Sequence, residues 1–159
     1  MSDRPNATDS PRSAGAVPVG ALLLIAALAV MGWLLFGPGP NIGDWHEQID
    51  PALAAATESR RPVLVYFTAD WCPPCRSFKK NVLTRKDVQD YLSANFEQAL
   101  VDLSDRRGPN NFVAQRYGVR SIPTLLVLTP EGGQVQRQAG GFDSPRFLAW
   151  LKRSAPAGG

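Results

Sequence analysis

Apolar and polar positions divide the chain into an uncharged first part and a later part in which apolar runs alternate with mixed ones. No charged residue lies between Ser13 and Gly43, and the run Val17–Phe36 shows no polar face at helical spacing. A helix of that length spans about 30 Å, the hydrocarbon thickness of a bilayer. We therefore predict a transmembrane signal anchor over residues 16–36, preceded by a disordered polar tail over residues 1–15.

A cleavable signal peptide is the alternative interpretation of this apolar run. It would need a shorter apolar region followed by a small-residue cleavage site, whereas the run continues through Trp33 into a Gly/Pro segment. An uncleaved anchor is therefore favoured. Arg4 and Arg12 precede the span, and the first basic residue after it is Arg60. The positive-inside rule places the N-terminus in the cytoplasm and the following domain outside, where disulfides persist.

The rest of the chain predicts one domain over residues 47–153, joined to the anchor by a linker over 37–46 and followed by a flexible tail over 154–159. The continuous apolar run Val63–Phe67 is typical of a central strand covered on both faces. Helices and strands alternate at first, and two strands then meet through a tight turn, which predicts an α/β fold with a mixed central sheet flanked by helices. Further strands are predicted over 96–103, 124–129 and 134–138, and helices over 50–61, 75–83, 88–95, 111–119 and 146–153.

Local signals predict where three of these helices begin. Asp50 followed by Pro51 predicts an N-cap and a first helical residue. The segment Thr84–Asp87 is a possible capping-box variant before the next helix. Ser144–Pro145 opens the last helix, whose closing turn carries basic residues that the helix dipole favours.

Composition narrows the function classes. The chain has 17 Lys and Arg against 14 Asp and Glu, without a long basic run or a basic stripe interleaved with aromatic residues, so a nucleic-acid partner is disfavoured. Two cysteines cannot form a disulfide framework or a four-cysteine zinc site. The only histidine, His46, is interpreted as a solvated residue after the membrane linker. We therefore predict neither a metal nor a cofactor.

Both cysteines lie in one short segment, Thr68–Phe78, which reads TADWCPPCRSF. The pair Cys72 and Cys75 is compatible with a redox couple, half of a metal site or a structural disulfide. At the junction of a buried strand and a helix, free backbone N–H groups and the helix dipole favour a thiolate, so Cys72 is predicted to be the nucleophile and Cys75 the resolving thiol. A structural disulfide closing so short a loop would stabilise the fold little, which favours the redox couple.

Two prolines separate the cysteines. Pro73 and Pro74 have no N–H, which removes two donors from the first turn and leaves the amide of Cys75 to serve a Cys72 thiolate. Fewer donors stabilise the thiolate less, whereas the fixed proline dihedrals hold the two sulfurs at a set distance. The two effects oppose each other, so the sequence does not give the sign of the change in redox potential.

A second segment, Ser121-Ile122-Pro123, stands directly before a predicted strand. Cis peptide bonds occur almost only before proline, usually at tight turns. A cis Ile122–Pro123 bond would turn the backbone of Ser121 and Ile122 outward beside the sulfurs, where a client peptide can pair with it. An ordinary trans turn before the strand is the alternative.

These segments together resemble a known family. VLVYFTADWCPPC, then GVRSIPTLLVL, then a Gly-Gly pair before the last helix closely resemble thioredoxin, over roughly residues 47–153. Within that superfamily the chain most resembles the C-terminal thioredoxin-like domain of the transmembrane disulfide reductase DsbD and its stand-alone membrane-anchored relatives. The resemblance implies the thioredoxin fold, Cys72 as attacking thiol, Cys75 as resolving thiol, Pro123 in cis and Trp71 packed beside the site.

The chain departs from this resemblance at positions that tune the site in the family. Tyr66 stands where thioredoxin has a buried aspartate, and Leu100 lies near the position of its lysine. Lys79 stands where DsbD-type domains carry an acidic residue on the helix after the motif. Because a tyrosine hydroxyl titrates near pH 10, Tyr66 is a poor base, and plain core packing is its alternative role. Tyr66, Asp70 and Lys79 are therefore the possible tuning residues.

These observations predict a membrane-tethered periplasmic thiol-disulfide oxidoreductase that reduces disulfides of periplasmic client proteins. It would be a monomer in the bacterial inner membrane, with its N-terminus in the cytoplasm. The resemblance implies an integral membrane electron donor of the DsbD or CcdA type. A thiol oxidase and a cytochrome c maturation reductase are the alternatives within the enzyme class, and a non-catalytic thioredoxin-fold chaperone or metal-binding module is the alternative from another class.

Overall fold

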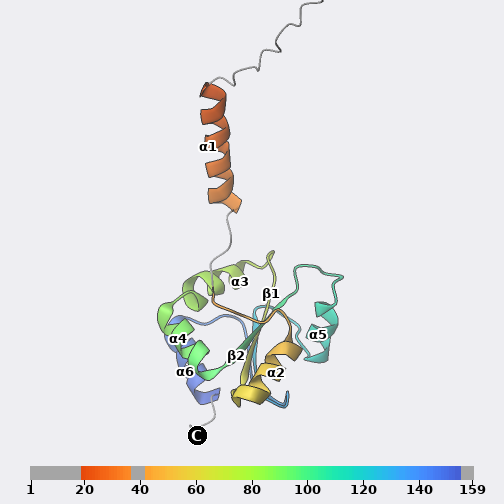
Figure 1. The fold of residues 1–159 in the computed structure, drawn as a ribbon. Coiled ribbons are helices and arrows are strands. Elements are labelled where there is room, and N and C mark those ends of the chain that lie inside the picture. The colour runs from red at the N-terminus through yellow and green to blue at the C-terminus, as the bar shows by residue number, and fades with distance from the viewer. Residues whose placement is uncertain (1–18, 37–41, 155–159) are drawn as a thin grey trace, which may run out of the picture. The chain divides into compact units, whose positions relative to one another are not determined.

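The computed structural model describes residues 19–36 and 42–154 of the chain (Figure 1). The chain divides into two compact units, Met1–Gly39 and Pro40–Gly159. The first unit contains helix α1, Val19–Phe36. Within the residues that the structure describes, no helix is both long enough and apolar enough to cross a bilayer. The membrane anchor therefore stays a prediction from the sequence.

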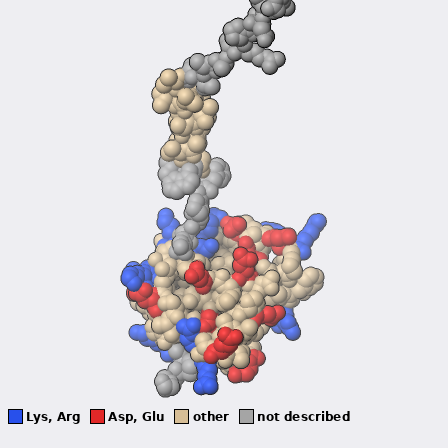
Figure 2. All heavy atoms as spheres, in the orientation of Figure 1, with Lys and Arg blue, Asp and Glu red and all other residues tan. Residues whose placement is uncertain are grey.

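Several predicted segments lie outside the described residues. They comprise the polar tail over residues 1–15, the first part of the linker and all but the first residue of the C-terminal tail. On the face of the second unit that Figure 2 shows, Lys and Arg side chains are interspersed with Asp and Glu. That face therefore carries both signs of charge.

A four-stranded sheet forms the centre of the second unit. Its strands are β1 (Val63–Thr68), β2 (Glu97–Asp102), β3 (Thr124–Leu128) and β4 (Gln134–Ala139), in the spatial order β2-β1-β3-β4. Strand β1 pairs parallel with β2 and antiparallel with β3, and β3 pairs antiparallel with β4. The predicted mixed sheet is confirmed, and every residue of β1 and β3 is buried, as expected of its central strands.

Helices cover both faces of this sheet. Figure 1 shows α4 and α6 on one side of it and α2 and α5 on the other. A short π-helical segment, η1, continues directly from α3. The bounds are α2 (Ile49–Ser59), α3 (Pro73–Phe78), η1 (Lys79–Leu83), α4 (Lys86–Asn95), α5 (Asn110–Arg116) and α6 (Ser144–Ser154).

Aromatic packing fixes α3 on the core. The ring of Phe78, at the end of α3, meets the ring of Phe147 edge-on, with 5.2 Å between centroids. Phe147 stacks on Trp150 one turn further along α6, at 6.1 Å. All three side chains are buried, and aromatic pairs in these arrangements contribute about 0.5–1.5 kcal/mol beyond their buried area. The helix that carries Cys75 is therefore attached to the core at its C-terminal end.

Helix α2 begins earlier than the sequence predicts. Its N-cap is Gln48, whose side chain caps nothing, and Asp50 lies inside the first turn. The prediction of Asp50 as N-cap is wrong because Ile49 belongs to the buried face of the helix, together with Ala52 and Ala56 at helical spacing. Packing of that apolar face determines the start of the helix.

The predicted capping box before α4 is also wrong. The Thr84 hydroxyl donates a hydrogen bond of 2.6 Å to the Lys80 carbonyl, in the preceding helical turn, so it caps nothing downstream. Arg85 takes the N-cap position. Its guanidinium binds the carboxylate of Asp87 with an Nε–Oδ1 distance of 3.0 Å.

The later part of the predicted linker packs on the domain. Ile42 is buried, and its carbonyl accepts a hydrogen bond of 2.8 Å from the indole N–H of Trp45. The backbone N–H of His46 donates to the Gln98 carbonyl, and its carbonyl accepts from the Leu100 N–H, both at 2.8 Å. His46 is thus a half-buried residue at the β2 edge of the sheet, which corrects its interpretation as a solvated linker residue.

Candidate functional site

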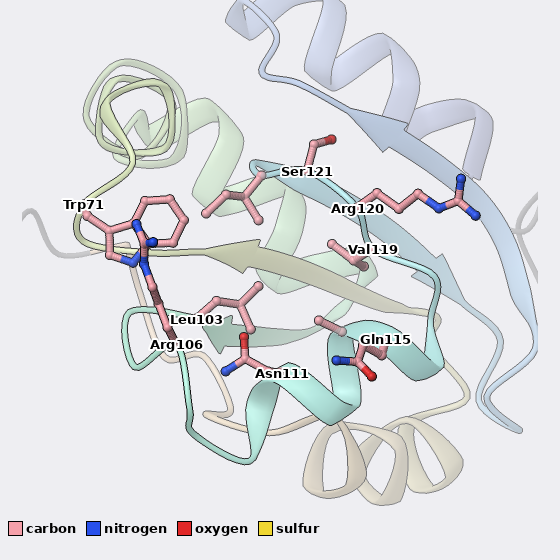
Figure 3. Close-up of a pocket in the computed structure, with 10 residues that line it drawn as sticks. Trp71, Leu103, Arg106, Asn111, Gln115, Val119, Arg120 and Ser121 are labelled. Carbon is pink, nitrogen blue, oxygen red and sulfur yellow. The ribbon is translucent and has the colours of Figure 1, made fainter.

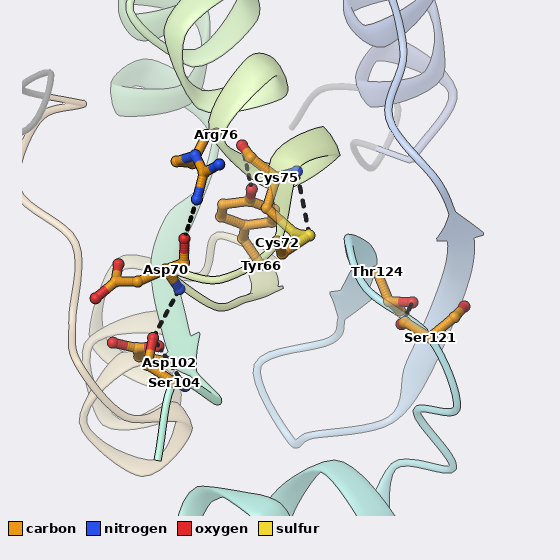
Figure 4. The surroundings of a disulfide bond; sticks show 9 residues. All are labelled: Tyr66, Asp70, Cys72, Cys75, Arg76, Asp102, Ser104, Ser121 and Thr124. Atoms are coloured by element: carbon orange, nitrogen blue, oxygen red, sulfur yellow. Dashed lines mark hydrogen bonds between the residues drawn. A yellow bond between two sulfur atoms is a disulfide. The ribbon is translucent and has the colours of Figure 1, made fainter. Parts of the chain in front are cut away.

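The two cysteines form a disulfide at the turn between β1 and α3 (Figure 4). Their sulfurs are 2.01 Å apart and their Cα atoms 5.3 Å apart. The Cys72 amide donates to the Ala69 carbonyl at 3.1 Å, which closes the turn after β1. Cys72 is the N-cap residue of α3 and Cys75 lies one turn inside, with exposed fractions of 3% and 1%. The sulfurs therefore lie where a sheet strand leads into a helix.

The helix start directs one backbone donor at the Cys72 sulfur. Pro73 and Pro74 occupy the first two helical positions and have no N–H. The amide of Cys75 is consequently the first donor of the helix, and it lies 3.2 Å from the Cys72 Sγ. This is the arrangement that the sequence predicts for stabilising a thiolate at Cys72.

The segment before β3 lies at the same end of the sheet. Phe67, near the end of β1, pairs with Thr124, the first residue of β3. The peptide bond Ile122–Pro123 is cis, the isomer that the resemblance implies. The Thr124 hydroxyl donates a hydrogen bond of 2.7 Å to the Ser121 carbonyl, which holds the turn closed across the proline (Figure 4).

A groove runs between this segment and Trp71. It encloses about 560 Å³ (Figure 3). Of the residues predicted for the site, Trp71, Ser121 and Ile122 line it. Trp71 is 48% exposed, and the guanidinium carbon of Arg106 lies 4.7 Å from the centre of its ring. The other lining residues are not among those predicted from the sequence: Leu103, Arg106, Asn111, Ala114, Gln115, Val119 and Arg120.

Tyr66 both packs in the core and contacts the site. Its side chain is fully buried, with ring centroids 6.3 Å from Trp45 and 5.7 Å from Phe78. Its hydroxyl donates a hydrogen bond of 3.0 Å to the Cys75 carbonyl. Burial raises the pKa of Tyr66 above its ordinary value, so the hydroxyl is neutral at physiological pH and is no base for the Cys75 thiol. Its direct cross-strand partner on β2 is Leu100.

Replacing Tyr66 with phenylalanine tests this hydrogen bond. The Cys75 carbonyl also accepts from the Lys79 N–H, so we expect the free energy of unfolding to fall by about 1 kcal/mol at neutral pH. Because the pKa of Tyr66 is raised in the native state, the unfolded wild-type chain loses the Tyr66 proton at a lower pH than the native chain does. The free energy of unfolding of the wild type therefore falls as pH rises above about 10. Urea unfolding at about pH 8 and about pH 10.5 should show a smaller alkaline loss for Tyr66→Phe. Equal losses in the two chains would contradict the assignment.

Among the described residues, no hydrogen bond joins Asp70 or Lys79 to either cysteine sulfur. Asp70 acts through its backbone: its N–H donates to the Ser104 hydroxyl at 2.7 Å, and its carbonyl accepts from the Arg76 guanidinium. Ser104 in turn donates to the Asp102 carboxylate at 2.5 Å. Lys79 is half-buried at the junction of α3 and η1 and makes no ion pair with a described residue.

Among the described residues, no group of three His, Cys, Asp or Glu side chains is placed to hold a metal ion. The site has two sulfurs joined to each other, an amide directed at one of them, and an exposed aromatic surface next to the cis-proline turn. This arrangement can exchange its disulfide with an external thiol or disulfide.

The chain is similar to a known protein family and to known proteins. Residues 49–155 match the family model described as a thioredoxin-like domain. The chain is 30% identical over 126 residues to thiol:disulfide interchange protein DsbD 1 of Pseudomonas aeruginosa, an alignment covering 75% of the chain and 21% of that protein. It is 29% identical over 125 residues to DsbD of Pectobacterium atrosepticum, covering 77% and 20%. The chain thus spans about a fifth of the length of these curated relatives.

Solved structures share the fold. A thioredoxin from Thermus thermophilus is 32% identical with a TM-score of 0.61, covering 69% of this chain and 84% of that one. A putative disulphide-isomerase from Bacteroides thetaiotaomicron is 27% identical with a TM-score of 0.62, covering 77% and 99%. The oxidised DsbD C-terminal domain of Neisseria meningitidis, at 18% identity, has a TM-score of 0.60 and covers 70% and 99%.

Proposed function

Because the chain belongs to the thioredoxin-like domain family, we propose that it exchanges electrons with protein disulfides through Cys72 and Cys75. Its relationship to DsbD and its cysteine pair make it a thiol-disulfide oxidoreductase. One observation carries the proposal. At the start of α3 the first backbone donor after the two prolines, the Cys75 amide, lies 3.2 Å from the Cys72 sulfur, where it stabilises a thiolate once the disulfide is reduced.

The exchange proceeds in two steps. In the reduced protein, the Cys72 thiolate attacks one sulfur of a client disulfide, forms a mixed disulfide and releases the other client sulfur as a thiolate. Cys75 then loses its proton and attacks the Cys72 sulfur. The Cys72–Cys75 disulfide forms, the second client thiolate leaves, and two electrons have passed to the client. One client sulfur takes up the proton that Cys75 loses, and the other carries the negative charge that the Cys72 thiolate brought, so protons and charge balance.

We propose the reductive direction because the curated relatives are DsbD proteins. The uncharged run Val17–Phe36 supports a tether in the bacterial inner membrane, with the domain in the periplasm. A reductase there needs electrons from across the membrane, which points to an integral membrane donor of the DsbD or CcdA type. The tether would keep the domain and its donor at high effective concentration.

Equilibration of the full chain with glutathione buffers tests this function and its direction. We expect the Cys72–Cys75 couple to titrate reversibly with a midpoint near that of thioredoxin, about −270 mV. A midpoint near that of DsbA, about −120 mV, would reverse the direction and favour an oxidase. If the Cys72–Cys75 pair does not equilibrate with glutathione at all, the proposed function is contradicted. Stoichiometric copper or zinc that is retained on purification and lost in Cys72→Ser would favour the metal-binding module instead.

A further inference from the structure

The groove beside the disulfide carries charge of one sign only. Of the residues that line it, Arg106 and Arg120 are charged, and none is Asp or Glu. Between them lie apolar side chains, including Leu103, Val119 and Ile122. On the face of the domain that Figure 2 shows, by contrast, side chains of both signs of charge occur.

Among the described residues, Arg106 has no carboxylate partner. It makes no ion pair with a described residue, and its guanidinium lies over the ring of Trp71. The neighbouring Asp105 is used by its own loop: its carboxylate accepts from the Arg107 N–H at 2.9 Å, and its carbonyl accepts from the Asn111 side chain at 2.8 Å. The charge of Arg106 therefore remains available to a ligand lying against Trp71.

Arg120 also lacks a carboxylate partner among the described residues. It is exposed and forms no ion pair with a described residue. Arg137 provides the contrast, because its guanidinium donates to the Tyr117 and Gly118 carbonyls and holds the chain after α5. Figure 3 shows Arg106 beside Trp71, and Arg120 on the other side of the groove next to Ser121, with its guanidinium extended away from the other lining residues. The two arginines thus lie on opposite sides of the apolar surface, Arg106 over Trp71 and Arg120 at its outer margin.

We propose that this groove selects client segments in which carboxylate side chains flank an apolar residue close to the disulfide. The inference rests on the proposed function, since it names the clients of the same site. Arginine recognises carboxylates through paired N–H donors, and the apolar lining offers burial to the residue between them. Because Ser121 and Ile122 line the groove, a segment held there runs along the cis-proline turn, whose backbone the sequence predicts to pair with a client peptide.

Three synthetic disulfide peptides test the selection. They share one sequence with an apolar residue beside the disulfide and differ only in whether Glu, Gln or Lys flanks it. The apparent second-order rate constant for reduction by the reduced full chain is measured for each. We expect the Glu peptide to react fastest and the Lys peptide slowest, with a preference for Glu over Gln that shrinks at high salt.

Matched variants assign the preference to the two arginines. We expect Arg106→Gln and Arg120→Gln each to lower the Glu-over-Gln ratio by roughly three-fold, and the double variant to abolish it. Arg153→Gln removes the same charge from the exposed last turn of α6, outside the groove, and should retain the wild-type ratio. The Glu-over-Gln ratio is taken within each variant, so a change in thiol chemistry that affects both peptides alike cancels from it.

Two outcomes would overturn the inference in distinguishable ways. If the wild-type chain reduces the Glu and Gln peptides equally fast, or if the double variant keeps the preference, the groove does not select by charge and the proposed function is untouched. If the wild-type chain reduces none of the three peptides, the proposed function itself fails and the client selection fails with it.

Discussion

Replacing Cys72 with serine is expected to reduce disulfide reductase activity to the uncatalysed background. Cys72 is the N-cap residue of α3, and its sulfur is the atom at which the Cys75 amide is directed. A serine hydroxyl in that place can accept the same hydrogen bond, so the fold should be retained, but it does not attack disulfides. Turbidity of insulin on reduction of its interchain disulfides, with dithiothreitol recycling the full chain, measures the loss.

Replacing Cys75 with alanine should have a different effect. Cys72 would still attack the client, but no second thiol would be present to release it, so the mixed disulfide accumulates. Non-reducing electrophoresis with a disulfide peptide should show a stable adduct for Cys75→Ala and none for Cys72→Ser. An adduct that forms through Cys75 when Cys72 is replaced would reverse the assigned roles of the two thiols.

The central part of this fold is predictable from the sequence because its signals are local. The apolar run from Val63 to Phe67 identifies β1 as a buried strand, and the structure extends it only to Thr68. The same holds for β3, which follows Pro123 directly. At the cysteine turn, the absence of N–H groups on two consecutive prolines leaves the Cys75 amide as the remaining donor, and the structure directs that amide at Cys72.

The groove is not predictable in this way because it depends on contacts between segments distant in the sequence. Arg106 lies in a polar loop without periodicity, and it reaches Trp71 because hydrogen bonds fix that loop. Ser104 accepts from the Asp70 N–H, and Asn110 donates to the Asp102 carbonyl at 2.8 Å. None of these residues forms a motif by itself, so the cation over Trp71 is evident only in the folded chain.

The same reason explains the two errors near the start of the domain. His46 joins the sheet through an isolated β-bridge, and a single paired residue leaves no alternation of apolar and polar side chains in the sequence. The start of α2 follows the burial of Ile49 rather than the nearest good capping residue, Asp50. At Tyr66 the resemblance to thioredoxin implies that a tyrosine stands in place of an acid, whereas the hydrogen bond from its hydroxyl to the Cys75 carbonyl depends on how α3 packs over β1.

Replacing Tyr66 with aspartate is expected to accelerate the second step of the exchange while strongly destabilising the fold. A carboxylate at this buried position beside α3 would supply the base that the wild-type site lacks, because the Tyr66 hydroxyl is a neutral donor with a raised pKa. We expect the mixed disulfide to decay about ten-fold faster or more in single-turnover insulin reduction. No acceleration would count against a proton-transfer limit at Cys75.

The stability cost has two parts. Loss of the ring between Trp45 and Phe78 leaves a cavity, for which about 3–5 kcal/mol is typical. Burial also raises the pKa of the new carboxyl above its unfolded value of about 3.9, so the native state holds its proton more tightly and stability falls as pH rises through that range. Tyr66→Asn creates a similar cavity without a base. The Tyr66→Asn chain should therefore lose the stability that the cavity costs at every pH, without the added pH-dependent loss. Its mixed disulfide should also decay no faster than that of the wild type. If that mixed disulfide decays as fast as the one of Tyr66→Asp, loosened packing rather than proton transfer is responsible.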